Sequence, residues 1–100
     1  MSADSENAAE ETVIFVTGDL DFHSAPELRK QIIAALNEGA SHLVLDLGDM
    51  EFVDSSGLSV MIAGFKRCKE RGGELTLRSP TERTLRLLEV SGLNRVLRTD

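Results

Sequence analysis

Apolar residues recur along this chain at two alternating spacings, one typical of strands and one typical of amphipathic helices. Residues 12–17, Thr-Val-Ile-Phe-Val-Thr, form a β-branched and aromatic run that predicts a buried strand. A second strand is predicted at 43–47 and is followed, after a break at 48–49, by the apolar pair at 52–53. The alternation of polar and apolar residues at 74–78 predicts a third strand with one face covered by helices.

The first predicted helix follows a turn at 18–21 and begins at Ser24. The Ser24 hydroxyl is expected to accept the N–H of Glu27, and the Glu27 carboxylate to reach back to the Ser24 N–H, which makes a capping box. Pro26 suits the first turn, and Gly39 ends the helix. The apolar stripe of this helix consists of Ala25, Leu28, Ile32, Ile33 and Leu36.

Two more amphipathic helices are predicted, each after one of the later strands. The middle helix ends at 72–73, and its apolar stripe consists of Leu58, Met61, Ile62, Phe65 and Cys68. The last helix is expected to begin at Ser79, with Pro80 at the first helical position and Glu82 completing a second Ser-x-x-Glu box, and to end at 91–92. Its expected core residues are Leu85 and Leu88, and an apolar segment of undecided type, Leu93, Val96 and Leu97, closes the chain.

This order of strands and helices predicts one α/β domain over residues 12–100. Alternating strands and helices give parallel strands joined by right-handed crossovers. A chain of 100 residues with 41% hydrophobic side chains can bury roughly two thirds of its unfolded surface. Residues 2–11 carry small and acidic side chains without a large apolar group, so we expect a flexible acidic tail at 1–11.

Charge and composition exclude several classes of function. The net charge is −6, from 11 Lys and Arg against 17 Asp and Glu, and Trp and Tyr are absent, so we expect no direct nucleic-acid binding. Cys68 has no second cysteine, and no His or Cys cluster indicates a metal site or a cofactor. No apolar run approaches the ~20 residues that span a bilayer, and the acidic start is unlike a signal peptide, so we expect a cytoplasmic protein without membrane contact.

The middle helix begins differently from the other two, at Asp54-Ser55-Ser56-Gly57-Leu58. Three capping residues and a glycine crowd one turn, and neither serine has the acidic partner that completes a capping box. Glycine here costs up to ~1 kcal/mol relative to alanine, which favours a close backbone approach. The positive end of the helix dipole can host a phosphate on its own serine. A well-equipped N-cap without any further role is the alternative.

A serine hydrolase is another alternative, with Ser55 as nucleophile, His23 or His42 as base and an Asp as orienting group. The sequence argues against it, because Val53 stands where the first glycine of the Gly-x-Ser-x-Gly nucleophile elbow would be. Gly72-Gly73 likewise lacks the Lys-Ser/Thr that a phosphate-binding P-loop needs. We therefore expect no catalytic residues.

The segment 54–58, preceded by the apolar pair 52–53, resembles the signature of the STAS domain family, and specifically of the bacterial anti-sigma factor antagonists. The resemblance covers nearly the whole chain beyond the tail. Further matching segments are Gly18-Asp19-Leu20-Asp21, Ala25-Pro26-Glu27-Leu28, Gly72-Gly73 and Ser91-Gly92-Leu93. Each segment is weak alone, but their order and spacing together are specific. The resemblance implies a small mixed β-sheet with amphipathic helices packed mainly on one side.

The same resemblance implies a phosphorylation switch. In the family, the first serine after the aspartate is phosphorylated, which points to Ser55 here and leaves Ser56 as its neighbour. The unphosphorylated chain is then expected to bind an anti-sigma factor that is also a GHKL-type serine kinase, and so to free the sigma factor. Phosphorylation releases the partner, and a serine phosphatase reverses the step. The expected partner-binding residues are Asp21, His23, Ser24, Asp54, Ser56, Gly57 and Leu58; for Asp21 a turn-capping role is an equal alternative.

Two points stay open within this resemblance. The family usually has an edge strand before the one at 12–17, and the residues available for it here, 5–9, are poor strand formers, so that strand is expected to be short or missing. A STAS subunit of a lipid-transport complex or of a signalling scaffold is the alternative role. The expected oligomeric state is a monomer or a weak dimer.

Overall fold

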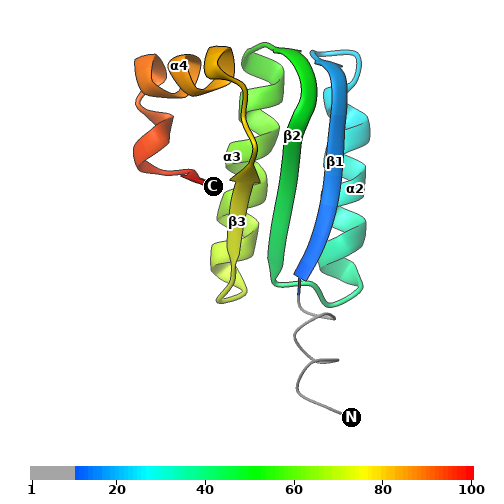
Figure 1. Cartoon of the computed structure of the whole chain (residues 1–100). Helices are drawn as coiled ribbons and strands as arrows, with labels where there is room; N and C mark the ends of the chain where they lie inside the picture. Colours follow the sequence, from blue (N-terminus) through cyan, green and yellow to red (C-terminus); the bar gives the residue numbers. More distant parts are fainter. Residues whose placement is uncertain (1–10) are drawn as a thin grey trace.

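Strands and helices alternate along the chain as predicted, in a computed structural model that describes residues 11–100 (Figure 1). The strands are β1 (Glu11–Leu20), β2 (His42–Val53), β3 (Glu74–Arg78) and β4 (Arg98–Thr99), and the helices are α2 (Ala25–Asn37), α3 (Ser55–Glu70), α4 (Glu82–Ser91) and the 3-10 turn η1 (Leu93–Arg95). The expected tail lies outside the described residues except for its last residue, Glu11, which begins β1. The expected edge strand at 5–9 lies outside them altogether.

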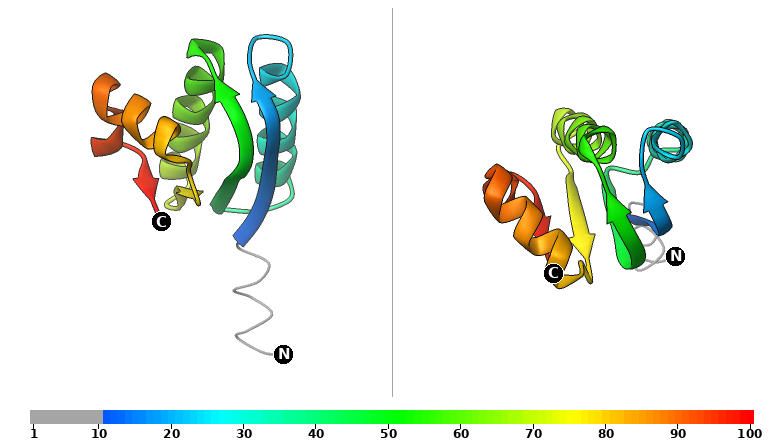
Figure 2. Two further views of the ribbon diagram at one scale, coloured as in Figure 1. Left: turned by 45° about the horizontal axis from the view of Figure 1, so that its top comes forward. Right: turned by 90° about the horizontal axis from the view of Figure 1, so that it is seen from above.

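The four strands form one sheet in the order β1-β2-β3-β4, and each neighbouring pair is parallel. Helices α2 and α3 cover the same face of this sheet, whereas α4 lies beyond β3 (Figure 2). The predicted α/β class, with helices mainly on one side, is confirmed. Within residues 11–100 the strand pairs are all parallel, so the mixed sheet that the resemblance implies is not seen in this range.

The core fills the space between the sheet and helices α2 and α3. Strand side chains alternate between the two faces, so every second residue of β1 and β3 points at the helices. The sheet contributes Ile14, Val16, Leu20, Leu43, Leu45, Leu47, Met50, Val53, Leu75 and Leu77. The helices contribute Ala25, Leu28, Ile32, Ala35, Leu36, Met61, Cys68 and Leu88. The closing segment of undecided type is η1 with β4, and Leu97 between them is buried.

Strand β2 is longer than predicted, because the break at 48–49 is a shift of register within the strand. Phe15 pairs with Asp46, but Thr17 pairs with Asp49, so β2 carries one more residue than β1 over this interval. The Asp46 carboxylate holds the irregularity: it accepts the N–H of Gly48 at 2.9 Å and the Nε–H of Arg78 at 2.8 Å. These two hydrogen bonds, the backbone one first, also hold the pKa of Asp46 below its usual range.

A second register shift decides which side chains point outward at the end of β2. Gly18 pairs with Met50 and Asp19 with Phe52, so β2 again gains a residue. As a result Val53 is buried while Phe52 is 46% exposed. The shift also corrects the predicted turn at 18–21, because residues 18–20 continue β1 and the turn begins only after them.

Both predicted capping boxes are wrong. Ser24 precedes α2 but its side chain makes no cap bond, because its hydroxyl is engaged in the preceding loop. Ser79 lies outside α4 and has a φ of 56°, which is incompatible with starting a right-handed helix. The N-cap of α4 is instead Thr81, whose hydroxyl accepts the N–H of Thr84 at 3.2 Å. This later start turns Thr84 inward beside Leu88 and leaves the expected core residue Leu85 37% exposed.

Helix α3 lies unusually close to the sheet because its buried face includes glycines. The residues buried along α3 are Gly57, Met61, Gly64 and Cys68, while the predicted Leu58, Ile62 and Phe65 are half-buried beside them. A Cβ atom on Gly57 would stand 2.7 Å from Leu20 Cγ and 2.7 Å from Val53 Cγ2. The close approach expected at Gly57 is therefore confirmed, and the surface it approaches is the end of β1 and β2.

Replacing Gly57 by alanine should destabilise the fold, although alanine is the better helix former. The added methyl must displace Leu20 and Val53, and overpacking of this kind costs about 1–3 kcal/mol. Urea unfolding of Gly57→Ala, followed by circular dichroism, measures the change in the free energy of unfolding. Ser59→Ala, at an exposed site of the same helix, is the matched control and should not destabilise. A gain in stability from Gly57→Ala would contradict the packing described here.

Candidate functional site

Two turns lie side by side at the edge of the sheet where β1 and β2 end. Leu20 and Val53 are register partners, and the N–H of Asp54 donates to the carbonyl of Leu20 at 3.1 Å. The loop 21–24 therefore lies next to the start of α3, as Figure 1 shows at the top of the molecule. Since carboxyl ends of parallel strands are where open α/β sheets place their sites, this edge is the candidate functional site.

Asp54 caps helix α3. Its backbone is extended, and its Oδ1 accepts the N–H groups of Ser56 at 2.8 Å and of Gly57 at 3.1 Å. Its own carbonyl accepts the N–H of Leu58 at 3.0 Å. Of the three potential capping residues in this turn, Asp54 is therefore the N-cap and accepts the free N–H groups of the first turn, and neither serine does so.

The two serines after Asp54 differ in their exposure. Ser55 is the first residue of α3 and is exposed, whereas Ser56 and Leu58 are half-buried and Gly57 is buried. The side chain that the sequence singles out for modification is thus the one that solvent and a partner can reach. Because Asp54 already occupies two of the first helical N–H groups, a group attached to Ser55 would be directed to solvent rather than onto those donors.

Asp21 organises the neighbouring loop. Its Oδ1 accepts the N–H of Ser24 at 3.1 Å and the N–H of His23 at 2.9 Å, and it lies 3.3 Å from the Ser24 hydroxyl. The hydrogen bond from the Ser24 N–H, followed by that from His23, holds the pKa of Asp21 below its usual range. This geometry gives Asp21 the turn-capping role that the sequence left open, and a partner contact by Asp21 stays a prediction.

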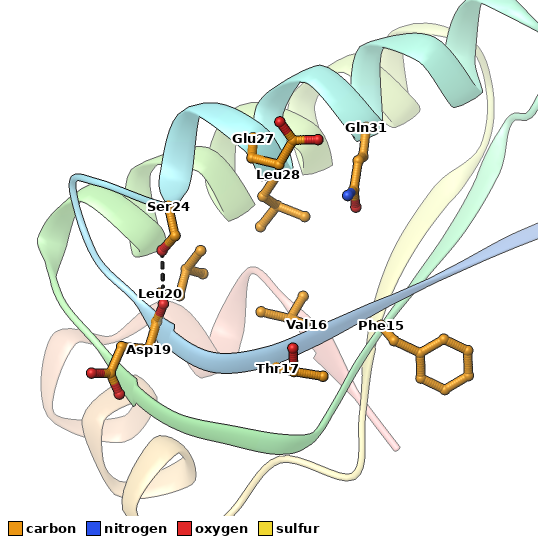
Figure 3. Close-up of a pocket in the computed structure, with 9 residues that line it drawn as sticks. All are labelled: Phe15, Val16, Thr17, Asp19, Leu20, Ser24, Glu27, Leu28 and Gln31. Atoms are coloured by element: carbon orange, nitrogen blue, oxygen red, sulfur yellow. Dashed lines mark hydrogen bonds between the residues drawn. The ribbon is translucent and has the colours of Figure 1, made fainter.

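Ser24 ties the same loop to β1. Its hydroxyl donates to the carbonyl of Asp19 at 2.7 Å and accepts the N–H of Asp21 at 3.0 Å, which explains why it does not cap α2. The bond to Asp19 closes one end of a hollow of about 160 Å³ between β1 and α2 (Figure 3). Leu28 from α2 and Val16 from β1 face each other across this hollow, and Leu20 lies beside Ser24. The loop conformation is thus fixed by backbone partners on both sides.

Phe22 is a site residue that the sequence analysis did not identify. It is 64% exposed at the tip of the loop, and its ring lies 4.0 Å from the ring of His23, centroid to centroid. The sequence feature that could have indicated Phe22 is its place between Asp21 and His23, in the short segment that connects the first strand to the first helix. Exposed aromatic side chains are enriched in protein interfaces, so Phe22 extends the candidate surface.

Of the two histidines considered as the base of a serine hydrolase, only His23 lies in the loop beside the start of α3. His42 begins β2 and Ser55 follows its end, so the two lie at opposite ends of that strand. The ring of His42 is paired with the hydroxyl of Ser41 at 3.1 Å. The Asp54 carboxylate is turned to the helix N–H groups rather than to a histidine that it could orient.

A metal site and a membrane span each require a recognisable arrangement of residues, for which residues 11–100 can be compared. No three His, Cys, Asp or Glu side chains in this range gather closely enough to hold a metal ion. None of the helices in the same range combines the length and apolar character that crossing a bilayer requires.

Comparison with known proteins identifies the fold. The STAS domain family model matches residues 3–100. The chain belongs to the STAS domain family. The Thermotoga maritima protein TM1081 has a solved structure that superposes with a TM-score of 0.84 at 27% identity, over 90% of this chain and 78% of that one. The similarity covers the part of the chain that holds Asp54, Ser55 and the adjacent loop.

Relatives of this STAS domain carry regulatory names. An anti-sigma-B factor antagonist of Bacillus subtilis strain 168 is 37% identical over 82 residues, which are 82% of this chain and 74% of the relative. The Bacillus anti-sigma factor antagonist SpoIIAA has the same fold in two solved states. Its unphosphorylated form superposes with a TM-score of 0.80 at 22% identity, over 92% of this chain and 81% of that one. Its phosphorylated form superposes with a TM-score of 0.73 at 24% identity, over 92% and 84%.

The loop next to Ser55 should owe part of its stability to the charge on Asp21. Because the pKa of Asp21 is lower in the folded chain than its ordinary 3.8, the carboxylate stabilises the fold above that value, and this contribution is lost as the pH falls through the folded pKa. Wild type should therefore be more stable than Asp21→Asn near neutral pH, with the difference vanishing in acid. Urea unfolding across this pH range measures it.

Asp49→Asn, at an exposed position of β2, is the control for this comparison. Its difference from wild type should change less with pH. If the difference between wild type and Asp21→Asn were independent of pH, the ionised carboxylate would not be what organises the loop.

Proposed function

We propose that this STAS domain is an anti-sigma factor antagonist that works as a phosphorylation-controlled partner switch, with Ser55 as the phosphate acceptor. The unphosphorylated chain binds an anti-sigma factor and thereby frees the sigma factor, and the phosphorylated chain does not bind. The observation that carries the proposal is the exposed Ser55 hydroxyl on a rigid, capped helix start. The regulatory relatives and the two states of SpoIIAA support the same function.

A phosphate on Ser55 leaves the fold almost unchanged in this account. The group adds about −1.5 to −2 charges to a chain of net charge −6. The helix dipole favours that charge by roughly 0.3–1 kcal/mol, while the neighbouring Asp54 carboxylate repels it. Since the N–H groups of Ser56 and Gly57 already donate to the Asp54 side chain, we expect the phosphate to leave the conformation of the helix start unchanged.

The phosphate acts on docking instead. A hydrated dianion at the centre of a protein interface costs several kcal/mol to bury unless a cation faces it. Because each 1.4 kcal/mol is about a tenfold change in affinity, such a cost abolishes a micromolar complex. The contact surface we propose consists of Asp21, His23, Ser24, Asp54, Ser56 and Leu58, and the exposed ring of Phe22 belongs with them. Gly57, which the resemblance also predicts to contact the partner, is buried against Leu20 and Val53 and supports this surface from the inside.

The partners follow from the chemistry of the switch. Phosphorylation of a serine requires an ATP-dependent serine kinase, which we propose to be the anti-sigma factor itself, of the GHKL type. Return to the binding form requires a serine phosphatase. A STAS subunit of a lipid-transport complex would need neither enzyme, so phosphorylation by a cognate kinase separates the two roles.

Incubation with ATP and the cognate anti-sigma factor kinase should add one phosphate to this chain, and peptide mapping should locate it on Ser55. The exposed hydroxyl at the first helical position is accessible to a kinase, while Ser56 is half-buried. Intact mass spectrometry followed by tryptic mapping makes the measurement. Ser55→Ala should take up no phosphate, whereas the control Ser59→Ala, at an exposed position of the same helix outside the proposed contact surface, should be phosphorylated like wild type. Phosphate on Ser56, or an unmodified wild-type chain, would reject the proposal.

A further inference from the structure

A second surface adjoins the start of α3. Phe52 and Val53 at the end of β2, with Leu87 and Val90 on α4, line an apolar groove of about 350 Å³, and Arg83 and Arg86 flank it. We call this surface the α4 groove. Val53 is joined to Ser55 through Asp54 alone, and α4 lies at the same end of the molecule as the start of α3 (Figure 1).

Two of the apolar side chains of the α4 groove are exposed and do not contribute to the core. Helix α4 is already anchored by Thr84 and Leu88, which are 4% and 0% exposed. On its groove face Leu87 is half-buried, and Val90 is 80% exposed although its side chain is entirely apolar. Phe52 faces the same groove and is 46% exposed. Contiguous exposed apolar surface with a polar rim is typical of protein interaction sites.

The charge at the rim is opposite to that of the whole chain. The chain carries a net −6, yet the charged residues that line the α4 groove are the two arginines. The ion pairs formed within residues 11–100 use Arg78 and Arg98, so the guanidinium groups of Arg83 and Arg86 have no carboxylate partner in this part of the chain. A ligand that combines apolar side chains with carboxylates therefore complements the groove.

We propose that the α4 groove is a second contact of the same anti-sigma factor, for a segment of that protein with apolar anchors flanked by Asp or Glu side chains. The inference rests on the proposed function. Continuity with the Ser55 turn means that one partner can cover both surfaces. A second copy of this chain fits less well, because a two-fold interface through the groove would bring the arginines of both copies together. The two contacts have different roles. Binding at the Ser55 turn depends on whether Ser55 is phosphorylated, whereas the α4 groove contributes affinity that does not depend on phosphorylation.

The test measures binding of the full, unphosphorylated chain to its purified anti-sigma factor by titration calorimetry. Val90→Asp and the double variant Arg83→Glu with Arg86→Glu should each raise the Kd about tenfold or more. Val96→Asp is the matched control, because Val96 is also an exposed valine, at 45%, but does not line the groove. It should bind like wild type. Thermal unfolding of each variant confirms that it is folded, which the exposure of these side chains makes the expected result.

The outcomes separate this inference from the function on which it rests. If wild type does not bind the anti-sigma factor, the proposed function fails and the inference with it. If wild type binds and both groove variants bind equally well, the inference alone is overturned. Loss of binding in Val90→Asp but not in the arginine variant would overturn the acidic chemistry of the partner segment.

Two further measurements test the other occupants of the groove. If wild type sediments with phosphatidylglycerol vesicles and the double arginine variant does not, the groove binds a membrane surface, and the proposal of a protein partner is overturned. A wild-type dimer in light scattering that Val90→Asp dissociates would overturn it in favour of a second copy. Absence of both effects, together with the loss of anti-sigma factor binding, supports the inference.

Discussion

The arrangement of this STAS domain depends on the close approach of Gly57 to Leu20 and Val53. With no side chain at Gly57, the first turn of α3 rests directly on the ends of β1 and β2, where a Cβ atom would be only 2.7 Å from each neighbour. The Asp54 N–H bond to the Leu20 carbonyl holds the same junction from the other side. Together these contacts fix where the helix starts, and therefore where Ser55 stands relative to the loop that follows β1.

The contact between the start of α3 and the ends of β1 and β2 fixes the position of two neighbouring turns, the start of α3 and the loop 21–24. Asp54 satisfies the helix, so Ser55 has no structural task of its own and its hydroxyl is exposed. In the adjacent loop 21–24, Asp21 and Ser24 form hydrogen bonds with each other and with the backbone, and Phe22 at the tip of this loop is exposed to solvent. The hydrogen bonds that hold the two turns are made by Asp54, Asp21 and Ser24, whereas the side chains of Ser55 and Phe22 are exposed. We therefore expect a modification of Ser55 to change recognition without disturbing the fold.

The strands and helices themselves could be predicted from periodicity, because burial in an α/β domain imposes it directly. The predictions failed where local chemistry competed with the pattern. Ser24 matched a capping box, but its hydroxyl found closer backbone partners in the loop. The sequence predicts a break at 48–49 instead of a continuous β2, because register shifts leave no mark in the spacing of a single strand. Ser55 was identifiable from the motif, whereas Phe52 and Val90 were not, since only the packing of α4 against the end of β2 shows that both lie in one groove.

The central claim is that a phosphate on Ser55 acts on the interface and not on the fold. Its most direct test uses the chain carrying phosphoserine at position 55, introduced during synthesis, beside the unmodified chain. Both forms are titrated with the anti-sigma factor and unfolded with urea. The account predicts that the phosphorylated form has nearly the same free energy of unfolding and a Kd raised a hundredfold or more, equivalent to roughly 2.7 kcal/mol. Equal affinity of the two forms, or a loss of binding matched by an equal loss of stability, would contradict it.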